Sequence, residues 1–152
     1  MRHRGLVATA AVWLVGFGVL RVSLLAPEEC PTISKAEAVA SATTAAEWLE
    51  AGQQRDGRYL YEYDRSTGQP REGYNLVRHA GVTMSLYQLA AAGADDALDA
   101  ADEGMELMLD RLEPAGDGLA LVERGSSTAR VGASALMVAA LLDRRAATGD
   151  ER

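Results

Sequence analysis

The amino-acid sequence predicts an all-α protein in which one apolar N-terminal helix precedes two α/α hairpins. Three observations indicate this. No residue from Leu6 to Leu20 is charged. Beyond Pro31, apolar residues recur every three or four positions, the period of a helix with one buried face. A similar turn sequence occurs twice, beginning at Asp56 and at Asp117.

The apolar segment is long enough to cross a membrane. Counting Arg21, it has about 20 residues, which at 1.5 Å per residue matches the ~30 Å hydrocarbon core of a bilayer. Arg21 lies near its far end, where its long side chain can reach the headgroups. The predicted organisation is therefore an N-terminus at 1–5, a transmembrane segment at 6–26, a linker at 27–33, and a body at 34–150 with hairpins at 34–93 and 95–149.

The flanking charges predict an orientation. Arg2 and Arg4 precede the apolar segment, whereas Glu28 and Glu29 follow it. The positive-inside rule then places the N-terminus in the cytoplasm and the body outside a single-pass cell membrane protein. The segment ends without a pair of small residues spaced for cleavage, so we expect a retained anchor or uncleaved signal instead of a cleaved signal peptide.

Composition excludes several classes of function. The net charge is −7 and Lys35 is the only lysine, which argues against a nucleic-acid partner. The single cysteine, Cys30, excludes an intrachain disulfide and a cysteine-based zinc cluster, and we expect a free thiol there instead of a lipidated one. The histidines are His3 and His79, on opposite sides of the predicted membrane, so we expect neither a metal site nor a cofactor.

The first hairpin pairs an amphipathic helix with a buried one. Ser34 and Glu37 have the spacing of a capping box, which predicts a helix start followed by a surface helix to about residue 53. The second helix is expected to start after the N-cap Asn75 and to end at Gly93. Its side chains are almost all small or apolar, which predicts a buried helix.

The second hairpin repeats this alternation. An amphipathic helix is expected from about 95 to 112, and a buried one from about 128 to 147, closed by Gly149. The connections also match, because Asp56-Gly57 and Asp117-Gly118 are each followed by four mostly apolar residues and a glutamate. We expect each glycine to take a positive φ in a turn before a short extended piece.

These features together resemble the α/α toroids, namely the six-hairpin glycosidase-like and terpenoid cyclase or prenyltransferase-like folds. The resemblance covers about residues 34–150, including Tyr74-Asn75-Leu76-Val77-Arg78-His79-Ala80-Gly81, and implies an architecture more than a chemistry. A closed toroid needs more hairpins than two, so we expect an incomplete one. The alternatives are a small helical domain that packs as it stands, or one that completes its core by oligomerising.

In the toroids, the central cavity is lined by the N-terminal ends of the inner helices and the turns before them. The resemblance places seven residues there: the candidate catalytic carboxylates Glu62, Asp64 and Glu123, and the candidate substrate-binding residues Tyr61, Tyr63, Arg78 and His79. Carboxylates can act as acid, base or nucleophile toward a sugar, and aromatic rings can stack on it. Positive charge in the first turn opposes the helix dipole, so Arg78 and His79 either bind a ligand or pair with Asp64 or Glu62.

Two functions are consistent with these patterns. The first is a membrane-anchored carbohydrate-active enzyme of the cell envelope, a hydrolase, lyase or epimerase, with a glycan as its partner. The second is a non-catalytic helical module that docks on a partner protein or self-associates, because two hairpins leave apolar surface uncovered. The sequence does not establish that the protein is an enzyme.

Overall fold

The computed structural model describes residues 2–24, 30–71 and 73–150. They form two compact units, Met1–Ile33 and Ser34–Arg152, which are described separately. The protein is mostly helical with a few short strands. The prediction of an all-α class is therefore confirmed at this level, with the strands confined to two small hairpins.

The first unit contains helix α1, Arg2–Leu24. Its part Gly5–Leu24 is long and apolar enough to cross a membrane, as far as length and composition can show. Arg21 lies in the last turn, as expected from the sequence. The predicted end of the segment at residue 26 and the beginning of the linker at 27–29 lie outside the described residues.

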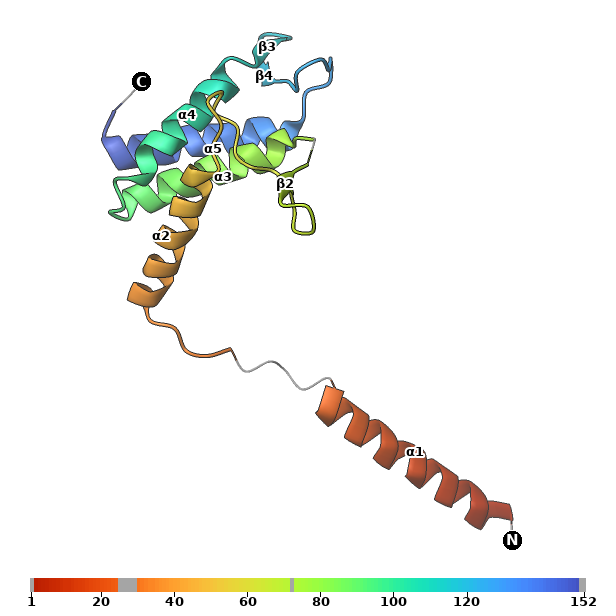
Figure 1. Cartoon of the computed structure of the whole chain (residues 1–152). Helices are drawn as coiled ribbons and strands as arrows, with labels where there is room; N and C mark the ends of the chain where they lie inside the picture. Colours follow the sequence, from red (N-terminus) through yellow and green to blue (C-terminus); the bar gives the residue numbers. More distant parts are fainter. Residues whose placement is uncertain (1, 25–29, 72, 151–152) are drawn as a thin grey trace. The chain divides into compact units, whose positions relative to one another are not determined.

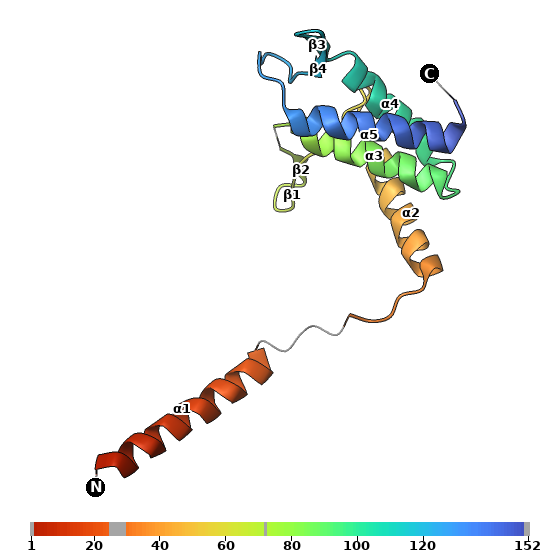
Figure 2. The same cartoon turned by 180° about the vertical axis from the view of Figure 1, so that it is seen from behind.

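The second unit, which we call the body, contains the four predicted helices. These are α2 Lys35–Ala51, α3 Leu76–Ala91, α4 Ala97–Leu109 and α5 Val131–Thr148. Helix α3 packs against both α4 and α5, and α3 and α5 run side by side in the same direction in both views (Figures 1 and 2). Helix α2 packs on α3 and α4 through its C-terminal part, where Ala46 is buried.

Three predicted helix ends are confirmed by their caps. The Ser34 hydroxyl accepts a hydrogen bond from the Glu37 N–H while the Glu37 carboxylate accepts one from Ser34 N–H, so the capping box is formed. The Asn75 side chain accepts bonds from Val77 N–H and Arg78 N–H at the start of α3. Gly149 ends α5 with a φ of 69°.

Two short antiparallel hairpins precede helices α3 and α5, respectively. Strands β1 Tyr63–Asp64 and β2 Gln69–Pro70 form the first, and β3 Leu112–Ala115 and β4 Gly118–Leu121 form the second. Leu112 pairs with Leu121, so the residue predicted to end the third helix instead begins a strand.

One prediction about the repeated turn is wrong. Gly57 has the expected positive φ of 79°, but in the second turn the positive φ of 61° belongs to Gly116, and Gly118 begins a strand instead. The reason is the β3–β4 pairing, which places the two-residue turn at Gly116-Asp117, one residue earlier than the predicted Asp117-Gly118. The two halves thus share their helices but not their turn geometry.

The core of the body lies around α3. Buried apolar side chains from α3, α4 and α5 meet there, among them Leu76, Leu86, Tyr87, Met105, Met108, Met137 and Ala140. Helix α5 was predicted to be buried, and this is only half right. Ala133, Met137 and Ala140 face α3, whereas Val131 and Leu142 are 85% and 64% exposed because no described element covers that side.

Candidate functional site

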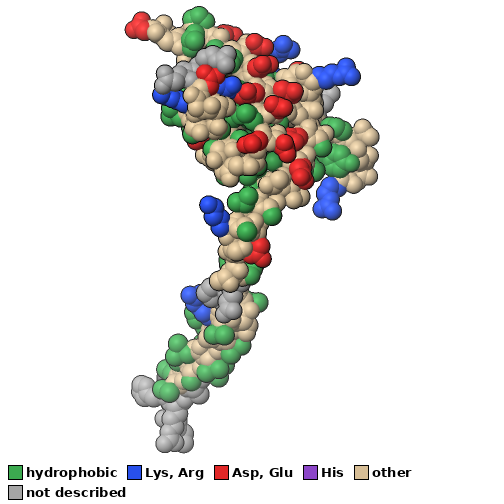
Figure 3. Space-filling model, turned by 90° about the vertical axis from the view of Figure 1, so that its left-hand side faces the viewer, with side chains coloured by type: hydrophobic (Ala, Val, Ile, Leu, Met, Phe, Trp, Pro, Cys, Tyr) green, Lys and Arg blue, Asp and Glu red, His purple; other side chains and the backbone are tan. Residues whose placement is uncertain are grey.

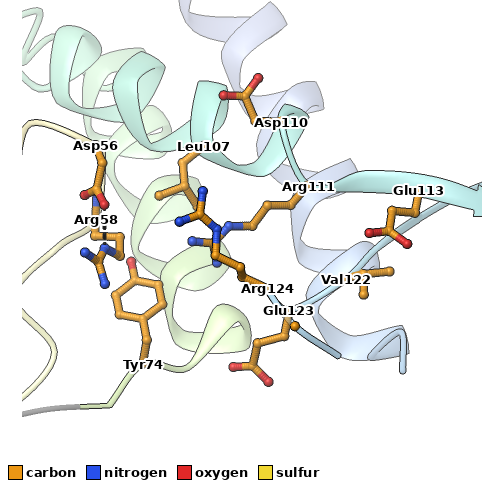
Figure 4. A pocket seen from close by; sticks show the side chains of 11 residues that line it. Asp56, Arg58, Tyr74, Leu107, Asp110, Arg111, Glu113, Val122, Glu123 and Arg124 are labelled. Carbon is orange, nitrogen blue, oxygen red and sulfur yellow. Dashed lines mark hydrogen bonds and ion pairs between the residues drawn. The ribbon is translucent and has the colours of Figure 1, made fainter. Parts of the chain in front are cut away.

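Two neighbouring hollows lie at the end of the body where α3 begins. The larger pocket has a volume of about 680 Å³ and lies between the turn at Asp56 and the β3–β4 region (Figure 4). The smaller pocket has a volume of about 110 Å³ and lies over the first turn of α3. Tyr74, which directly precedes the N-cap of α3, lines both pockets.

The Tyr74 hydroxyl is hydrogen-bonded to Nδ1 of His79. The other ring nitrogen, Nε2, lies 2.7 Å from the Gly104 carbonyl oxygen on α4. Because a carbonyl oxygen only accepts, the neutral ring carries its proton on Nε2, and Nδ1 accepts the proton of Tyr74. The Tyr74 oxygen also accepts from the Tyr59 backbone N–H at 3.3 Å. Tyr74 is thus fixed from two directions.

This pair is uncharged at neutral pH. Burial lowers the pKa of His79, which is 2% exposed, and the positive charge of Arg111 lowers it further. Burial raises the pKa of Tyr74 to about 12, although the Tyr59 N–H and the charges of Arg111 and Arg58 act in the opposite direction. His79 therefore positions Tyr74 as a protonated hydroxyl at the boundary of the two pockets.

Helix α4 approaches this pair closely through Gly104. A Cβ atom at Gly104 would lie 2.2 Å from the Tyr59 hydroxyl oxygen and 2.7 Å from Oγ1 of Thr83. The Tyr59 hydroxyl fills that space and donates to the Ala100 carbonyl at 3.1 Å. Glycine at this position is what allows the Tyr59 hydroxyl to lie against the α4 backbone.

The smaller pocket has an aromatic and cationic wall. The guanidinium of Arg78 lies 5.1 Å from the centre of the Tyr61 ring, and the rings of Tyr61 and Tyr74 are 6.0 Å apart. Apolar atoms of Leu49 and Val82 complete the lining. The structure therefore places the predicted residues Tyr61, Arg78 and His79 around one hollow.

The larger pocket contains three arginines from distant parts of the sequence. Arg58 follows the turn at Gly57, Arg111 lies two residues after the end of α4, and Arg124 lies in the loop after β4. Figure 4 shows Arg111 and Arg124 extending toward the side of the pocket where Arg58 and Tyr74 lie. The Arg58 guanidinium is 5.8 Å from the centre of the Tyr74 ring, and its Nε donates to the Asp56 carboxylate at 2.8 Å.

The predicted carboxylates are placed differently. Asp64 accepts hydrogen bonds from Ser66 and, at 3.0 Å, from Arg71, and these bonds lower its pKa to about 2. Glu62 is exposed and lines neither pocket. Glu123 lines the larger pocket and lies 3.8 Å from Arg130.

Two further expectations are corrected or left without support. Within the described residues, Arg78 and His79 form no ion pair with Asp64 or Glu62, because Arg71 holds Asp64 and Tyr74 holds His79. Tyr63, predicted to bind substrate, is 52% exposed on β1 and lines neither pocket. In the same part of the chain, no cluster of three or more metal-binding side chains is present.

Sequence reasoning missed five residues of these pockets, namely Tyr59, Tyr74, Arg58, Arg111 and Arg124. Tyr59 and Tyr74 lie in connections whose path the sequence does not specify. The arginines are up to 66 positions apart and meet only after α4 has folded back on α3. No local signal marked these residues, since even Arg111 falls inside the helix predicted from about 95 to 112.

Comparison with models of protein families, with curated proteins and with solved structures found no match to this chain.

Proposed function

We propose that the body binds carbohydrate and that it belongs to the α/α-toroid class of helical proteins. The observation that carries this proposal is the wall of the smaller pocket, where Tyr61, Tyr74 and Arg78 surround a hollow beside a larger pocket. Tyrosine rings present an apolar face to a sugar ring and a polar edge to its hydroxyl groups. Concave sites with few polar groups on an apolar lining are typical of small-molecule binding.

The proposal includes a location. Helix α1 would anchor the protein in the cell membrane by a single pass, with the N-terminus in the cytoplasm and the body outside. The length and apolar composition of Gly5–Leu24 support the anchor, and the arginines that precede the segment support the orientation. A glycan of the cell envelope would then be within reach of the body.

The geometry supports binding better than hydrolysis. Glycosidases use two carboxyl groups on either side of the scissile bond. Among the described residues, no carboxylate lines the smaller pocket, and Asp64 is held by Arg71 away from it. Hydrolase, lyase or epimerase activity thus stays a prediction from the resemblance, and the proposal rests on recognition of the glycan.

The test is retention on glycans. The full chain in detergent micelles is incubated with insoluble peptidoglycan, chitin and cellulose, and its binding isotherm is measured by pull-down. We expect retention on at least one of them, and a loss of roughly tenfold in affinity for Tyr61→Ala and for Arg78→Ala, because each removes part of the pocket wall. Tyr63→Ala is the matched control, since Tyr63 is exposed and outside the pocket. Equal retention of all variants would refute the proposal.

A second candidate function is self-association through α5. Val131, Val138 and Leu142 form one stripe on this helix and are 85%, 58% and 64% exposed. A continuous apolar stripe of this kind on a soluble surface usually contacts another protein. Sedimentation of the full chain in micelles tests this, with Val138→Lys and Leu142→Lys expected to abolish a dimer if the stripe forms one. A monomeric wild-type protein would exclude it.

A further inference from the structure

The guanidinium groups in the larger pocket are poorly compensated. Arg58 donates through Nε to the Asp56 carboxylate, and its two terminal nitrogens have no hydrogen-bond partner among the described residues. In the same part of the chain, Arg111 and Arg124 form no ion pair at all. A half-buried arginine such as Arg111 normally recruits a carboxylate or another acceptor, whereas the exposed Arg124 is also open to solvent.

Among the described carboxylates that line this pocket, Asp56 pairs with Arg58, whereas Asp110, Glu113 and Glu123 form no ion pair with Arg111 or Arg124. In Figure 4 the carboxyl groups of Asp110 and Glu123 point away from the guanidinium groups of Arg111 and Arg124, and Glu113 lies on the opposite side of the pocket. Glu123 is instead 3.8 Å from Arg130. Arg111 and Arg124 are thus left without a carboxylate partner among the described residues of this hollow, although Arg58 has one.

This arrangement is unusual for a body with so many acids. Residues 31–152 have a net charge of −8, from 12 basic and 20 acidic side chains. Acidic side chains gather on another face of the body, shown in Figure 3. In such a protein, arginines that converge without partners are best explained by an anionic group of a ligand, since two forked guanidinium groups match a carboxylate or a phosphate.

The charge of Arg111 also reaches the pair at the pocket boundary. Arg111 and Tyr74 line the same pocket, and Figure 4 shows Arg111 extending toward the side where Tyr74 lies. An anion held by Arg111 would therefore sit beside the Tyr74 hydroxyl, which is the group shared by both pockets. The anionic group and a sugar ring in the smaller pocket would belong to one molecule.

We infer that the larger pocket binds the carboxylate or phosphate group of an acidic sugar, through Arg111 and Arg124 with Arg58 as a third donor. The choice of a sugar rests on the proposed function, whereas the anion site stands on the arginines alone. The site accepts uronic acids or sugar phosphates and discriminates against neutral sugars, because an uncharged ligand leaves these guanidinium groups unpaired.

The experiment is an NMR titration of the full chain in detergent micelles, following the Nε–Hε signals of Arg111 and Arg124. The probes are glucuronate, glucose 6-phosphate, inorganic phosphate and glucose, each raised to tens of millimolar. We expect the two sugar anions to shift both signals in a saturable way that weakens with added salt, and glucose to leave them unchanged. Comparing the two sugar anions decides between carboxylate and phosphate.

The variants separate this inference from the proposed function. Arg111→Gln with Arg124→Gln, followed at the Nε–Hε signal of Arg58, is expected to weaken binding of the sugar anions at least tenfold. Arg65→Gln, which replaces an exposed arginine outside the pocket, should leave binding unchanged. A double variant that binds as well as the wild type, or no response to any anion, overturns the inference. A response to glucose that is confined to the Tyr61 signals would refute the inference and leave the proposed function intact. Inorganic phosphate that binds as tightly as glucose 6-phosphate would refute the proposed function and leave the anion site intact.

Discussion

Replacing Gly104 by alanine tests how closely α4 packs on the tyrosine cluster. Two effects of opposite sign compete at this position. Alanine in a helix interior is favoured over glycine by about 1 kcal/mol. The added Cβ, however, would lie 2.2 Å from the Tyr59 hydroxyl oxygen, 2.7 Å from Thr83 Oγ1 and 2.9 Å from Tyr59 Cζ. These separations are shorter than real Cβ contacts, so Tyr59 must move.

The structure gives the size of the expected effect. Overpacking a core costs about 1–3 kcal/mol. Displacing Tyr59 also breaks its hydroxyl bond to the Ala100 carbonyl, which adds about 1 kcal/mol. After subtracting the helix propensity gain, Gly104→Ala should lower the free energy of unfolding by about 2 kcal/mol, which for a body of this size corresponds to a melting temperature roughly 8 °C lower.

Urea unfolding followed by far-ultraviolet circular dichroism measures this directly. The matched control is Gly81→Ala on α3, where the nearest atom to a Cβ would be Leu136 Cδ1 at 3.9 Å, an ordinary contact. This variant should be neutral or more stable by up to about 1 kcal/mol. In the double variant with Tyr59→Phe, the cost of Gly104→Ala should shrink because the hydroxyl oxygen is gone. A stabilising Gly104→Ala would refute the close packing.

Three further predictions concern the stability of the body. Burial lowers the pKa of His79, so the free energy of unfolding should fall as the pH drops below about 6.5, the pKa of histidine in the unfolded chain. Between about pH 7.5 and 5.5, the urea midpoint of His79→Gln should therefore shift less than that of the wild type. Asp102 accepts two hydrogen bonds from Arg144 at 2.8 and 3.1 Å, and Asp102→Asn should cost about 1–2 kcal/mol in the same assay; an unchanged midpoint would contradict this. Gly57 has a φ of 79°, and an added Cβ would lie 2.4 Å from the Glu103 carbonyl oxygen, so Gly57→Ala should lower the free energy of unfolding by about 3 kcal/mol. Gly116 has a φ of 61° but open space around it, so Gly116→Ala should lower it by about 1 kcal/mol. Equal losses would show that the close approach of Gly57 to Glu103 has no effect.

Helix positions in this protein could be predicted because their signals are local. The capping box at Ser34, the N-cap at Asn75 and the glycine at Gly149 each act within one turn of the chain, and all three were found in the structure. The β3–β4 hairpin was harder to locate. Its register depends on Leu112 meeting Leu121, which moved both the end of α4 and the turn glycine from their predicted positions.

The candidate site was predictable only in part, for a similar reason. Arg78 and His79 stood out because cations are unfavourable in the first turn of a helix. Their partners did not, because Tyr74 and Gly104 are close to His79 only through the path of the loop and the packing of α4 on α3. The burial of α5 was overestimated because apolar composition alone does not say on how many sides a helix is covered.

Helix α2 leaves most of its length in solvent, and this has a mechanical consequence. Only its C-terminal part packs on the body, so the first three turns, from Lys35, depend on the capping box and on their own backbone bonds. Amide hydrogens in these turns should exchange with deuterium far faster than those of α3. A pulling force applied at Ser34 would therefore unwind the start of α2 before it disturbed the packing around Ala46, so the pockets at the start of α3 would keep their shape.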